Sequence, residues 1–289
     1  MLKDLINSFR IKQWVKNGFL FAGLIFDEQL FAITPLFHTI IGFFIFNILT
    51  SSVYLINDVF DVNVDRQHPE KKNRPIAAGR ISERTAITVA VTLISFAAVG
   101  SYYLSSKFFL ICLIYFLTNL LYSKWLKHVP ILDVFIIALG FVLRVAAGVS
   151  LITVKRFSPW LYVVTTLLAL FLGFGKRRAE MILFSHDTHK RRAVLDGYTL
   201  AFLDQLITIV SSATILAYSL YTFSAPGLPG NYTMMLTIPF VMYGIFRYLY
   251  LIQVKQSGGA PEETLFQDVP LLINVFLYAL CVLILFYLK

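Results

Sequence analysis

Long apolar runs separated by short polar segments dominate the chain. Nine stretches approach the roughly twenty apolar residues that an α-helix needs to cross a bilayer. These stretches cover residues 17–33, 36–57, 86–104, 108–123, 131–152, 159–175, 203–223, 232–252 and 269–288. The first is the least regular, because Asp27 and Glu28 interrupt it. The pattern predicts an all-α integral membrane bundle of about nine transmembrane helices.

The composition supports a membrane protein and narrows the choice of partners. Hydrophobic residues make up 58% of the 289 residues and charged residues 14%, which is more apolar surface than one soluble core can hide from water. The formal net charge of +9 suits either nucleic acid or an anionic membrane surface. Since no long linker interrupts the spans, residues 1–289 are expected to form a single transmembrane domain.

Lysine and arginine are distributed unevenly between the predicted loops. With the N-terminus placed in the cytoplasm, 20 of the 25 Lys and Arg residues fall on the cytoplasmic side. Lys107, Lys155, Arg156 and Lys289 fall outside, and Arg144 lies within a span. This asymmetry predicts a cytoplasmic N-terminus and an external C-terminus in a bacterial-type inner membrane. It also assigns the positive charge to the membrane and not to nucleic acid.

Four oxygen-bearing side chains recur at the cytoplasmic end of the second span: Asn57, Asp58, Asp61 and Asp65. On a helix they fall within an arc of about 100°. Carboxylates so close to a bilayer need cations, and oxygen ligands without His or Cys suit Mg²⁺ held against substrate phosphates. A solvated helix end is the plain alternative, but this stripe continues an apolar span. We therefore predict a catalytic cluster in which Asp58, Asp61 and Asp65 bind Mg²⁺.

Basic residues near span ends are candidates for binding phosphate groups. Lys71 and Arg74 follow the acidic cluster, and the triplet at residues 176–178 emerges directly from the sixth span. Guanidinium groups bind phosphate oxygens through paired hydrogen bonds, which favours this role. The alternative is that such cations only set the membrane topology, and for residues 190–192 both interpretations are equally supported.

Three further polar residues are candidates from their position. Arg144 is the one basic residue predicted well inside a span, where an ionisable group is a functional candidate, although pairing with another helix is the alternative. Lys16 and Asn17 precede the first span and either anchor the chain at the membrane surface or meet the phosphate of a lipid carrier.

The spacing Asn-Asp-x-x-Asp-x-x-x-Asp over residues 57–65 resembles the aspartate-rich signature of the UbiA superfamily of membrane prenyltransferases. The resemblance implies a helical bundle around a central cavity, with Mg²⁺ held between acidic helices and a diphosphate. Other segments resemble the branch of this superfamily that transfers 5-phosphoribose to decaprenyl phosphate. They are residues 10–17, 57–69, 74–79, 132–135, 175–180 and 258–263.

The chain departs from the aromatic prenyltransferases of that superfamily after the sixth span. Those relatives carry a second, closely spaced aspartate motif there, whereas Asp187, Asp196 and Asp204 are spread at intervals of nine and eight. A donor with an additional phosphate fits the basic triplet found here instead. Which of Asp196, Tyr198 and Asp204 supplies a second acidic wall stays open.

The resemblance implies a Mg²⁺-dependent phosphoribosyltransferase that joins phosphoribosyl diphosphate to a polyprenyl phosphate and releases diphosphate. The residues expected to bind these substrates are Lys16, Asn17, Lys71, Arg74, Arg144, Lys176, Arg177, Arg178, Glu180, Tyr198 and Asp204. The main alternative is an aromatic prenyltransferase that uses a prenyl diphosphate. A transporter is a remote alternative, because the spans lack paired Gly/Pro interruptions.

Overall fold

The structure is a computed structural model that describes residues 2–67, 71–155, 158–183, 193–229, 231–256 and 261–287, and every regular element in these ranges is helical. The elements up to residue 128 are α1 (Leu2–Ser8), η1 (Ile11–Leu20), α2 (Phe21–Phe26), α3 (Ile33–Phe60), α4 (Val62–Gln67), η2 (Lys71–Asn73), α5 (Glu83–Leu104), α6 (Ser106–Lys124) and η3 (Leu126–His128). The later elements are α7 (Leu132–Val149), α8 (Trp160–Leu183), η5 (Ala193–Gly197), α9 (Leu200–Ser224), η6 (Thr233–Thr237), α10 (Ile238–Gln253), α11 (Pro261–Gln267) and α12 (Val269–Tyr287).

Eight helical segments in the described residues are long and apolar enough to cross a bilayer. They are α3, α5, α6, α7, α8, α9, the η6–α10 run Thr233–Gln253, and α12. Each coincides with one of the predicted spans, so the expectation of an all-α membrane bundle is confirmed.

The first predicted span, residues 17–33, differs from the structure. Its residues form the end of η1 and the six-residue α2, neither of which is long enough to cross a bilayer. Two acidic residues explain the interruption. The Asp27 carboxylate accepts the backbone N–H of Lys155 at 3.0 Å, and Glu28 adopts a left-handed backbone conformation with φ of 56°. A continuous apolar helix is therefore broken where the sequence was least regular.

The described chain divides into two compact units. Unit 1 comprises residues 1–24, 29–129 and 143–153, and unit 2 comprises residues 25–28, 130–142 and 154–289. Helix α7 contributes residues to both units. The expectation of a single transmembrane domain stays a prediction.

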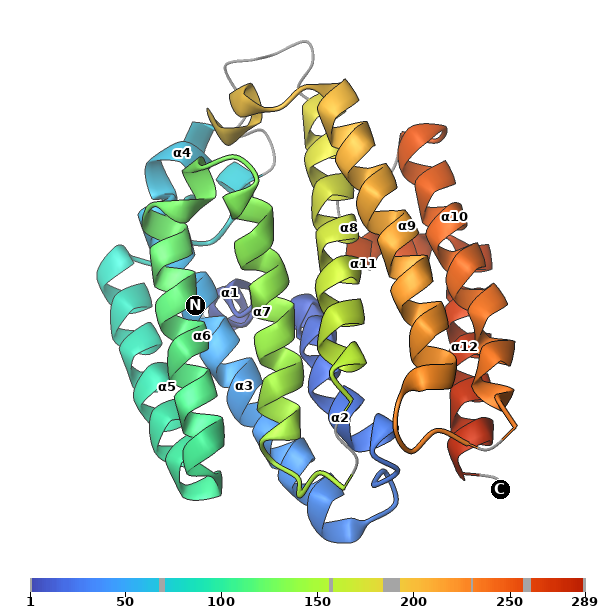
Figure 1. The fold of residues 1–289 in the computed structure, drawn as a ribbon. Coiled ribbons are helices and arrows are strands. Elements are labelled where there is room, and N and C mark those ends of the chain that lie inside the picture. Colours follow the sequence, from blue (N-terminus) through green and yellow to red (C-terminus); the bar gives the residue numbers. More distant parts are fainter. Residues whose placement is uncertain are drawn as a thin grey trace. The chain divides into compact units, whose positions relative to one another are not determined.

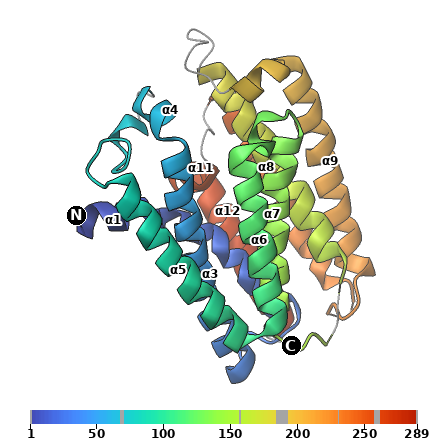
Figure 2. The same cartoon turned by 90° about the vertical axis from the view of Figure 1, so that its left-hand side faces the viewer.

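Unit 1 is built on α3, α5 and α6, which lie side by side (Figures 1 and 2). Ala86 and Ala90 of α5 are fully buried in a cluster with Leu55 of α3, and such small side chains let two helices approach closely in a membrane. A single residue, Ser105, separates α5 from α6. Its extended backbone ends one helix, and its hydroxyl accepts the backbone N–H of Phe108 to cap the next.

A close backbone approach in unit 1 depends on Gly148 of α7. A Cβ atom at this position would lie 1.8 Å from the carbonyl oxygen of Leu20. By contrast, a Cβ atom at Gly18 would meet nothing within 4 Å. The missing side chain at Gly148 therefore lets the end of η1 lie against the helix that carries Arg144.

Unit 2 is built on α8, α9, α10 and α12, and α8 packs against α9 along its length (Figure 1). Its core contains Phe171, Phe174, Leu203 and Ile207, all almost completely buried. The Thr199 hydroxyl accepts a backbone N–H in the first turn of α9 and caps this helix at its start. The packing positions the end of α8, which carries Arg177 and Arg178, and the start of α9, which carries Asp204.

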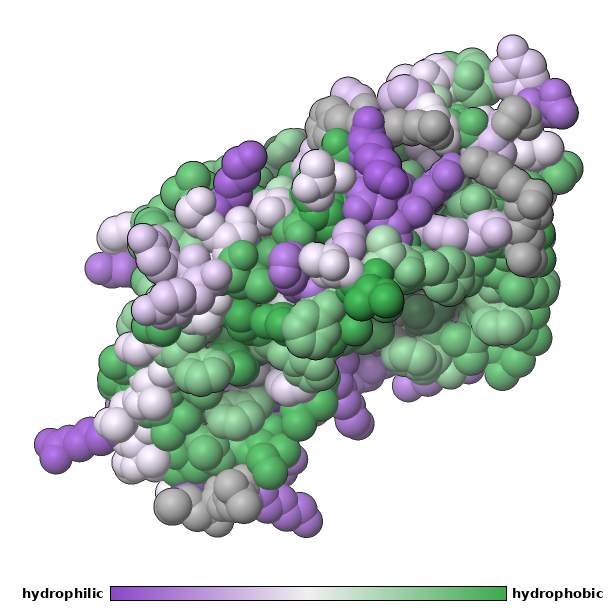
Figure 3. Space-filling model, turned by 90° about the horizontal axis from the view of Figure 1, so that it is seen from below, coloured by the Kyte–Doolittle hydropathy of each residue, from purple (hydrophilic) through white to green (hydrophobic). Residues whose placement is uncertain are grey.

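Apolar side chains cover much of the outer surface. Only 17% of the most apolar window of α5 is buried, and the side chains of Ile33 and Tyr103 are 85% and 84% exposed. Figure 3 shows green, apolar residues over much of the face in view, with purple polar groups gathered in a few places. Because water does not tolerate so large an apolar surface, the chain is an integral membrane protein.

Candidate functional site

The acidic cluster begins where α3 ends. The helix stops at Phe60, Asp61 leaves regular helical geometry with φ of −96° and ψ of 5°, and α4 starts at the next residue. The backbone N–H of Asp61 still donates to Asn57, and that of Asp65 to Asp61. The four polar side chains therefore belong to a helix end, a turn and a second short helix, and not to one straight helix as the spacing suggested.

Asp58 and Asp65 converge on one nitrogen atom. Nη1 of Arg74 lies 3.0 Å from Oδ1 of Asp58 and 2.6 Å from Oδ2 of Asp65. Both carboxylate side chains are 3% exposed, whereas the Arg74 side chain is 28% exposed. Arg10 also donates to Asp58, and its guanidinium lies 4.9 Å from the ring centre of Tyr54. Two buried acids are thus neutralised by two cations that reach them from the protein surface.

Asp61 and Asn57 have partners on other segments of unit 1. The ammonium of Lys127, just after α6, donates to Oδ1 of Asp61 at 2.6 Å. The Ser123 hydroxyl at the end of α6 donates to Oδ1 of Asn57. The Asp61 side chain is 37% exposed, so it is the most accessible acid of the cluster.

The donor set of the cluster matches a hard divalent cation, because it consists of carboxylate and amide oxygens. Asp58 and Asp65 present their oxygens to a common point, which is what a shared cation requires. Asp61 is directed toward Lys127 instead. Accordingly, the described residues contain no group of three or more His, Cys, Asp or Glu side chains close enough to hold a metal ion. Two of the three predicted ligands therefore fit a cation as they stand.

A second polar network in unit 1 joins Arg144 to Asn17. Nε of Arg144 donates to Oδ1 of Asn17 at 2.7 Å, and Nδ2 of Asn17 donates to Oδ1 of Asn47 at 2.6 Å and to Thr50 at 3.1 Å. The guanidinium also donates to the Tyr115 hydroxyl at 2.9 Å. All these residues are buried. The structure thus brings the two predicted residues Arg144 and Asn17 together.

The remaining predicted site residues of unit 1 are Lys16 and Lys71, and both are half-buried.

The Arg144 network includes one donor that is not satisfied. Nδ2 of Asn47 is buried and has no hydrogen-bond partner among the described residues. Since an unsatisfied buried amide costs about 1–3 kcal/mol, this donor is a costly feature of the network.

Arg177 lies in a closed ion-pair network of unit 2. Its Nε donates to Oδ2 of Asp133 at 2.6 Å and its Nη1 to Glu180 at 2.7 Å. The side chains of Arg177 and Asp133 are 1% and 0% exposed. The other Asp133 oxygen accepts the Tyr198 hydroxyl at 2.7 Å, and that hydroxyl in turn accepts the backbone N–H of Ile131. Burial and the hydrogen bond to Asp133 raise the pKa of Tyr198 well above its ordinary value, so it stays protonated.

The rest of the basic triplet is more accessible. Helix α8 continues to Leu183, so residues 176–178 lie on the helix and not in the loop expected after it. Arg178 donates from Nε to Asp204 at 2.6 Å and from Nη1 to the carbonyl of Ile252 at 2.8 Å. Lys176 is half-buried and Asp196 is exposed. Asp187 and the basic residues 190–192 lie outside the described residues.

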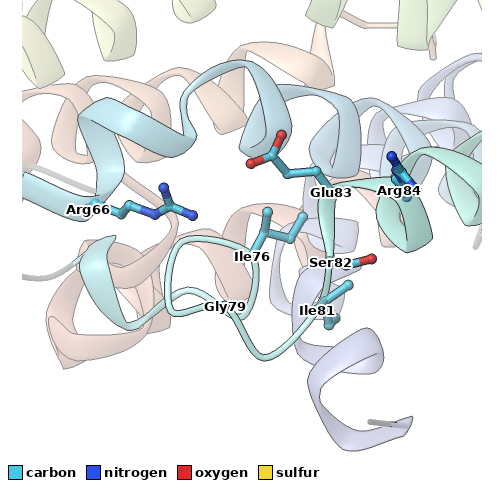
Figure 4. Close-up of a pocket in the computed structure, with 7 residues that line it drawn as sticks. All are labelled: Arg66, Ile76, Gly79, Ile81, Ser82, Glu83 and Arg84. Carbon is cyan, nitrogen blue, oxygen red and sulfur yellow. The ribbon is translucent and has the colours of Figure 1, made fainter.

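A pocket of about 400 Å³ lies beside the start of α5 in unit 1. It is lined by Arg66, Ile76, Gly79, Ile81, Ser82, Glu83 and Arg84, none of which was predicted as a site residue. In Figure 4 the Arg66 and Glu83 side chains extend toward each other above the loop that contains Ile76 and Gly79. Nε of Arg66 donates to the carbonyl of Ala77, which ties α4 to this loop.

Sequence reasoning missed three residues that the structure places in these clusters: Arg10, Lys127 and Asp133. Arg10 begins the segment 10–17 noted above, and Lys127 was counted only for topology. Asp133 is an acid within a predicted span, and such a residue is a candidate by the argument applied to Arg144. That signal was available, whereas the pairing of Lys127 with Asp61 depends on tertiary structure.

Comparisons with known proteins identify the family and the fold of the chain. The model of the UbiA prenyltransferase family matches residues 18–267. Decaprenyl-phosphate phosphoribosyltransferase of Mycobacterium tuberculosis is 31% identical over 276 residues, covering 93% of this chain and 89% of that protein. The protein of the same name from Corynebacterium glutamicum is 32% identical over 295 residues, covering 98% and 86%. A UbiA homolog from Archaeoglobus fulgidus, solved with GPP and Mg²⁺, shares the fold with a TM-score of 0.75 at 21% identity, covering 98% of this chain and 99% of that one. The chain belongs to the UbiA prenyltransferase family.

Proposed function

We propose that this chain transfers 5-phosphoribose from phosphoribosyl diphosphate to a polyprenyl phosphate and releases diphosphate. The observation that carries the proposal is the match, over nearly the whole chain, to relatives that bear the name decaprenyl-phosphate phosphoribosyltransferase. The buried acids Asp58 and Asp65, converging on a cation, support it because a diphosphate donor is bound through cations.

The cation proposed for this site is Mg²⁺, held by Asp58 and Asp65 with Asp61 as the third ligand. When bound, Mg²⁺ would neutralise charge on the leaving diphosphate. The homolog from Archaeoglobus fulgidus was solved both with Mg²⁺ and with Cd²⁺, which supports a divalent ion in this family.

The chain's own residues would act mainly by positioning and by neutralising charge. Arg10, Arg74 and Lys127 are cations whose side chains are 27%, 28% and 18% exposed, so they can contact both the acids and a phosphate group. A lipid phosphate is already anionic near neutral pH and needs no strong general base to attack C1 of the ribose. The reaction then breaks the bond from C1 to the diphosphate oxygen and forms one to the lipid phosphate oxygen.

We retain Lys176, Arg178 and Asp204 of unit 2 as proposed substrate ligands, because they are partly exposed. For Arg177, Glu180 and Tyr198 the proposal is a positioning role. Arg177 and Tyr198 are buried and hold Asp133, and Glu180 holds Arg177. Replacing Arg178 by Gln is expected to raise the KM for the sugar donor. An unchanged KM would leave Arg178 a role in structure or topology alone.

The proposed orientation places the N-terminus and the acidic cluster in the cytoplasm and the C-terminus outside. The distribution of Lys and Arg supports it. Single cysteines at Lys72 or Tyr232, in a background without Cys112 and Cys281, would test it with a membrane-impermeant maleimide on intact cells. We expect labelling at position 232 and none at position 72. The reverse pattern would show that the chain has the opposite orientation in the membrane.

The decisive experiment compares donors. Purified protein with Mg²⁺, decaprenyl phosphate and an aromatic acceptor receives either labelled phosphoribosyl diphosphate or labelled geranyl diphosphate. We expect the lipid to acquire the phosphoribosyl label only. Transfer of the geranyl label to an aromatic acceptor, with none from the sugar donor, would favour the aromatic prenyltransferase alternative.

A further inference from the structure

Arg74 stands where a cation bound by Asp58 and Asp65 would have to be. Its Nη1 contacts both carboxylates, at 3.0 and 2.6 Å. A Mg²⁺ ion binds oxygens at about 2.1 Å, so the ion and this nitrogen cannot both lie between the same two oxygen atoms. The guanidinium and a divalent cation are therefore competitors for one position.

The charges of the cluster make this competition strong. Asp58 and Asp65 are almost fully buried, and Arg10 and Arg74 balance their two negative charges. Adding a divalent ion would leave an excess of two positive charges in a poorly solvated place, which is unfavourable. The balance is restored only when a cationic side chain leaves the acids or an anion arrives with the metal.

The Arg74 side chain can leave without unfolding its segment. The backbone around it is fixed by hydrogen bonds from Arg74 to Lys71 and from Ala78 to Arg74, and Ile76 and Ala77 are buried. The guanidinium itself is 28% exposed, on a long and flexible stem. Once released, it presents a planar set of donors beside the cluster, which suits a phosphate group.

We propose that Arg74 is an internal competitor of the divalent cation, and that metal binding displaces its guanidinium from Asp58 and Asp65 onto the diphosphate of the donor. Metal and diphosphate then bind cooperatively, because the metal frees the arginine and the diphosphate accepts it. This inference rests on the proposed function only in taking a diphosphate as the leaving group of the donor.

The test uses the metal alone and then inorganic diphosphate. Mn²⁺ binding to purified protein is measured by electron paramagnetic resonance for wild type, Arg74→Gln and Arg80→Gln. Arg80 is a matched control from the same loop, paired with the partly exposed Asp4. Without its competitor, Arg74→Gln is expected to bind Mn²⁺ alone about ten-fold more tightly, which corresponds to about 1.4 kcal/mol. Arg80→Gln is expected to match wild type.

The second measurement adds inorganic diphosphate to the same titration. We expect diphosphate to tighten Mn²⁺ binding strongly in wild type and much less in Arg74→Gln. Arg74→Lys keeps the charge but cannot present a planar fork, so it should lie between them; melting curves confirm folding. Equal or weaker Mn²⁺ binding by Arg74→Gln, or an equal diphosphate effect in all variants, would overturn the proposal. Because no ribose is present, this result is independent of which donor the enzyme uses.

Discussion

The acidic cluster of unit 1 and the arginine network of unit 2 use the same residue types in opposite ways. Around Asp58 and Asp65 the acids are buried and their cations reach in from the surface, at 27% and 28% exposure. Around Asp133 the cation is buried as well, with Arg177 at 1% exposure. An ion pair with one accessible member can exchange that member for a ligand, whereas a fully buried pair can only be broken. The comparison suggests binding for the first region and structural support for the second.

The largest effect that would test this division concerns activity. Asp61→Ala is expected to lower turnover about a thousand-fold or more, roughly 4 kcal/mol, because it removes the most accessible acid of the cluster. The variant should remain folded and inserted in the membrane, as judged by its melting curve. Asp4→Asn is the control, since Asp4 is partly exposed and pairs with the exposed Arg80 away from the cluster. Activity like that of wild type in Asp61→Ala would remove the distinction between the two regions.

The next effect concerns stability. Asp133→Ala leaves Arg177 with Glu180 but without its fully buried partner, and breaking such a pair costs about 3–5 kcal/mol. The melting temperature in detergent is expected to fall by several degrees. The neighbouring change Arg178→Gln should cost about 1 kcal/mol or less, because its partner Asp204 is 37% exposed. If the two variants had the same melting temperature, the buried network would have no special structural role.

A smaller effect sharpens the description of unit 2. Tyr198→Phe removes the hydroxyl that joins Asp133 to the backbone of Ile131 and keeps the ring. The expected loss of stability is about 1–3 kcal/mol, since the buried Asp133 carboxylate and the backbone N–H of Ile131 lose a partner. Catalytic activity measured well below the melting temperature should change little. A large loss of turnover without a loss of stability would show that Tyr198 acts directly in the reaction and not in positioning.

The smallest effect depends on pH and concerns a partly exposed ion pair, Arg247–Asp268, as a contrast to the buried network. Asp268 accepts two hydrogen bonds from Arg247, at 3.0 and 2.8 Å, and this partner lowers the pKa of its carboxyl. A carboxyl whose pKa is lowered in the folded state stabilises the fold at pH values above its ordinary pKa near 4. That stabilisation is lost as the pH falls through the lowered pKa. Asp268→Asn should therefore melt slightly below wild type at pH 7. The gap should close as the pH falls below about 4, and a gap that does not depend on pH would exclude the ion pair as its cause.

The sequence predicted the spans well where hydropathy alone decides. The span placed at residues 36–57 corresponds to α3 at Ile33–Phe60, and the short break near Ser105 is present. The span at 17–33 was wrong, because apolar length says nothing about a carboxylate that takes a distant backbone N–H, as Asp27 does with Lys155. Helical periodicity likewise did not predict the turn at Asp61.

Of the site, the sequence indicated candidate residues but not their contacts. The spacing of Asp58, Asp61 and Asp65 predicted a shared Mg²⁺ ion, which stays a prediction; in the structure Arg74 pairs with Asp58 and Asp65. The roles of Arg10 and Lys127 depend on partners 48 and 66 residues away, and no local pattern specifies them. Arg177 was predicted as a phosphate ligand from its place at a span end, but burial on α8 gives it carboxylate partners instead.

The network that starts at Arg144 has a direction. A guanidinium can only donate, so Asn17 must turn its oxygen toward Arg144 and its NH₂ group toward Asn47. Asn47 must then offer its own oxygen and face its NH₂ group onward. Arg144 therefore fixes the orientation of two side-chain amides, first that of Asn17 and through it that of Asn47. Arg144→Lys should keep both amide orientations, because lysine is also a pure donor. Arg144→Gln would let the amides of Asn17 and Asn47 flip, so that Asn47 would present its carbonyl oxygen where it now presents its NH₂ group.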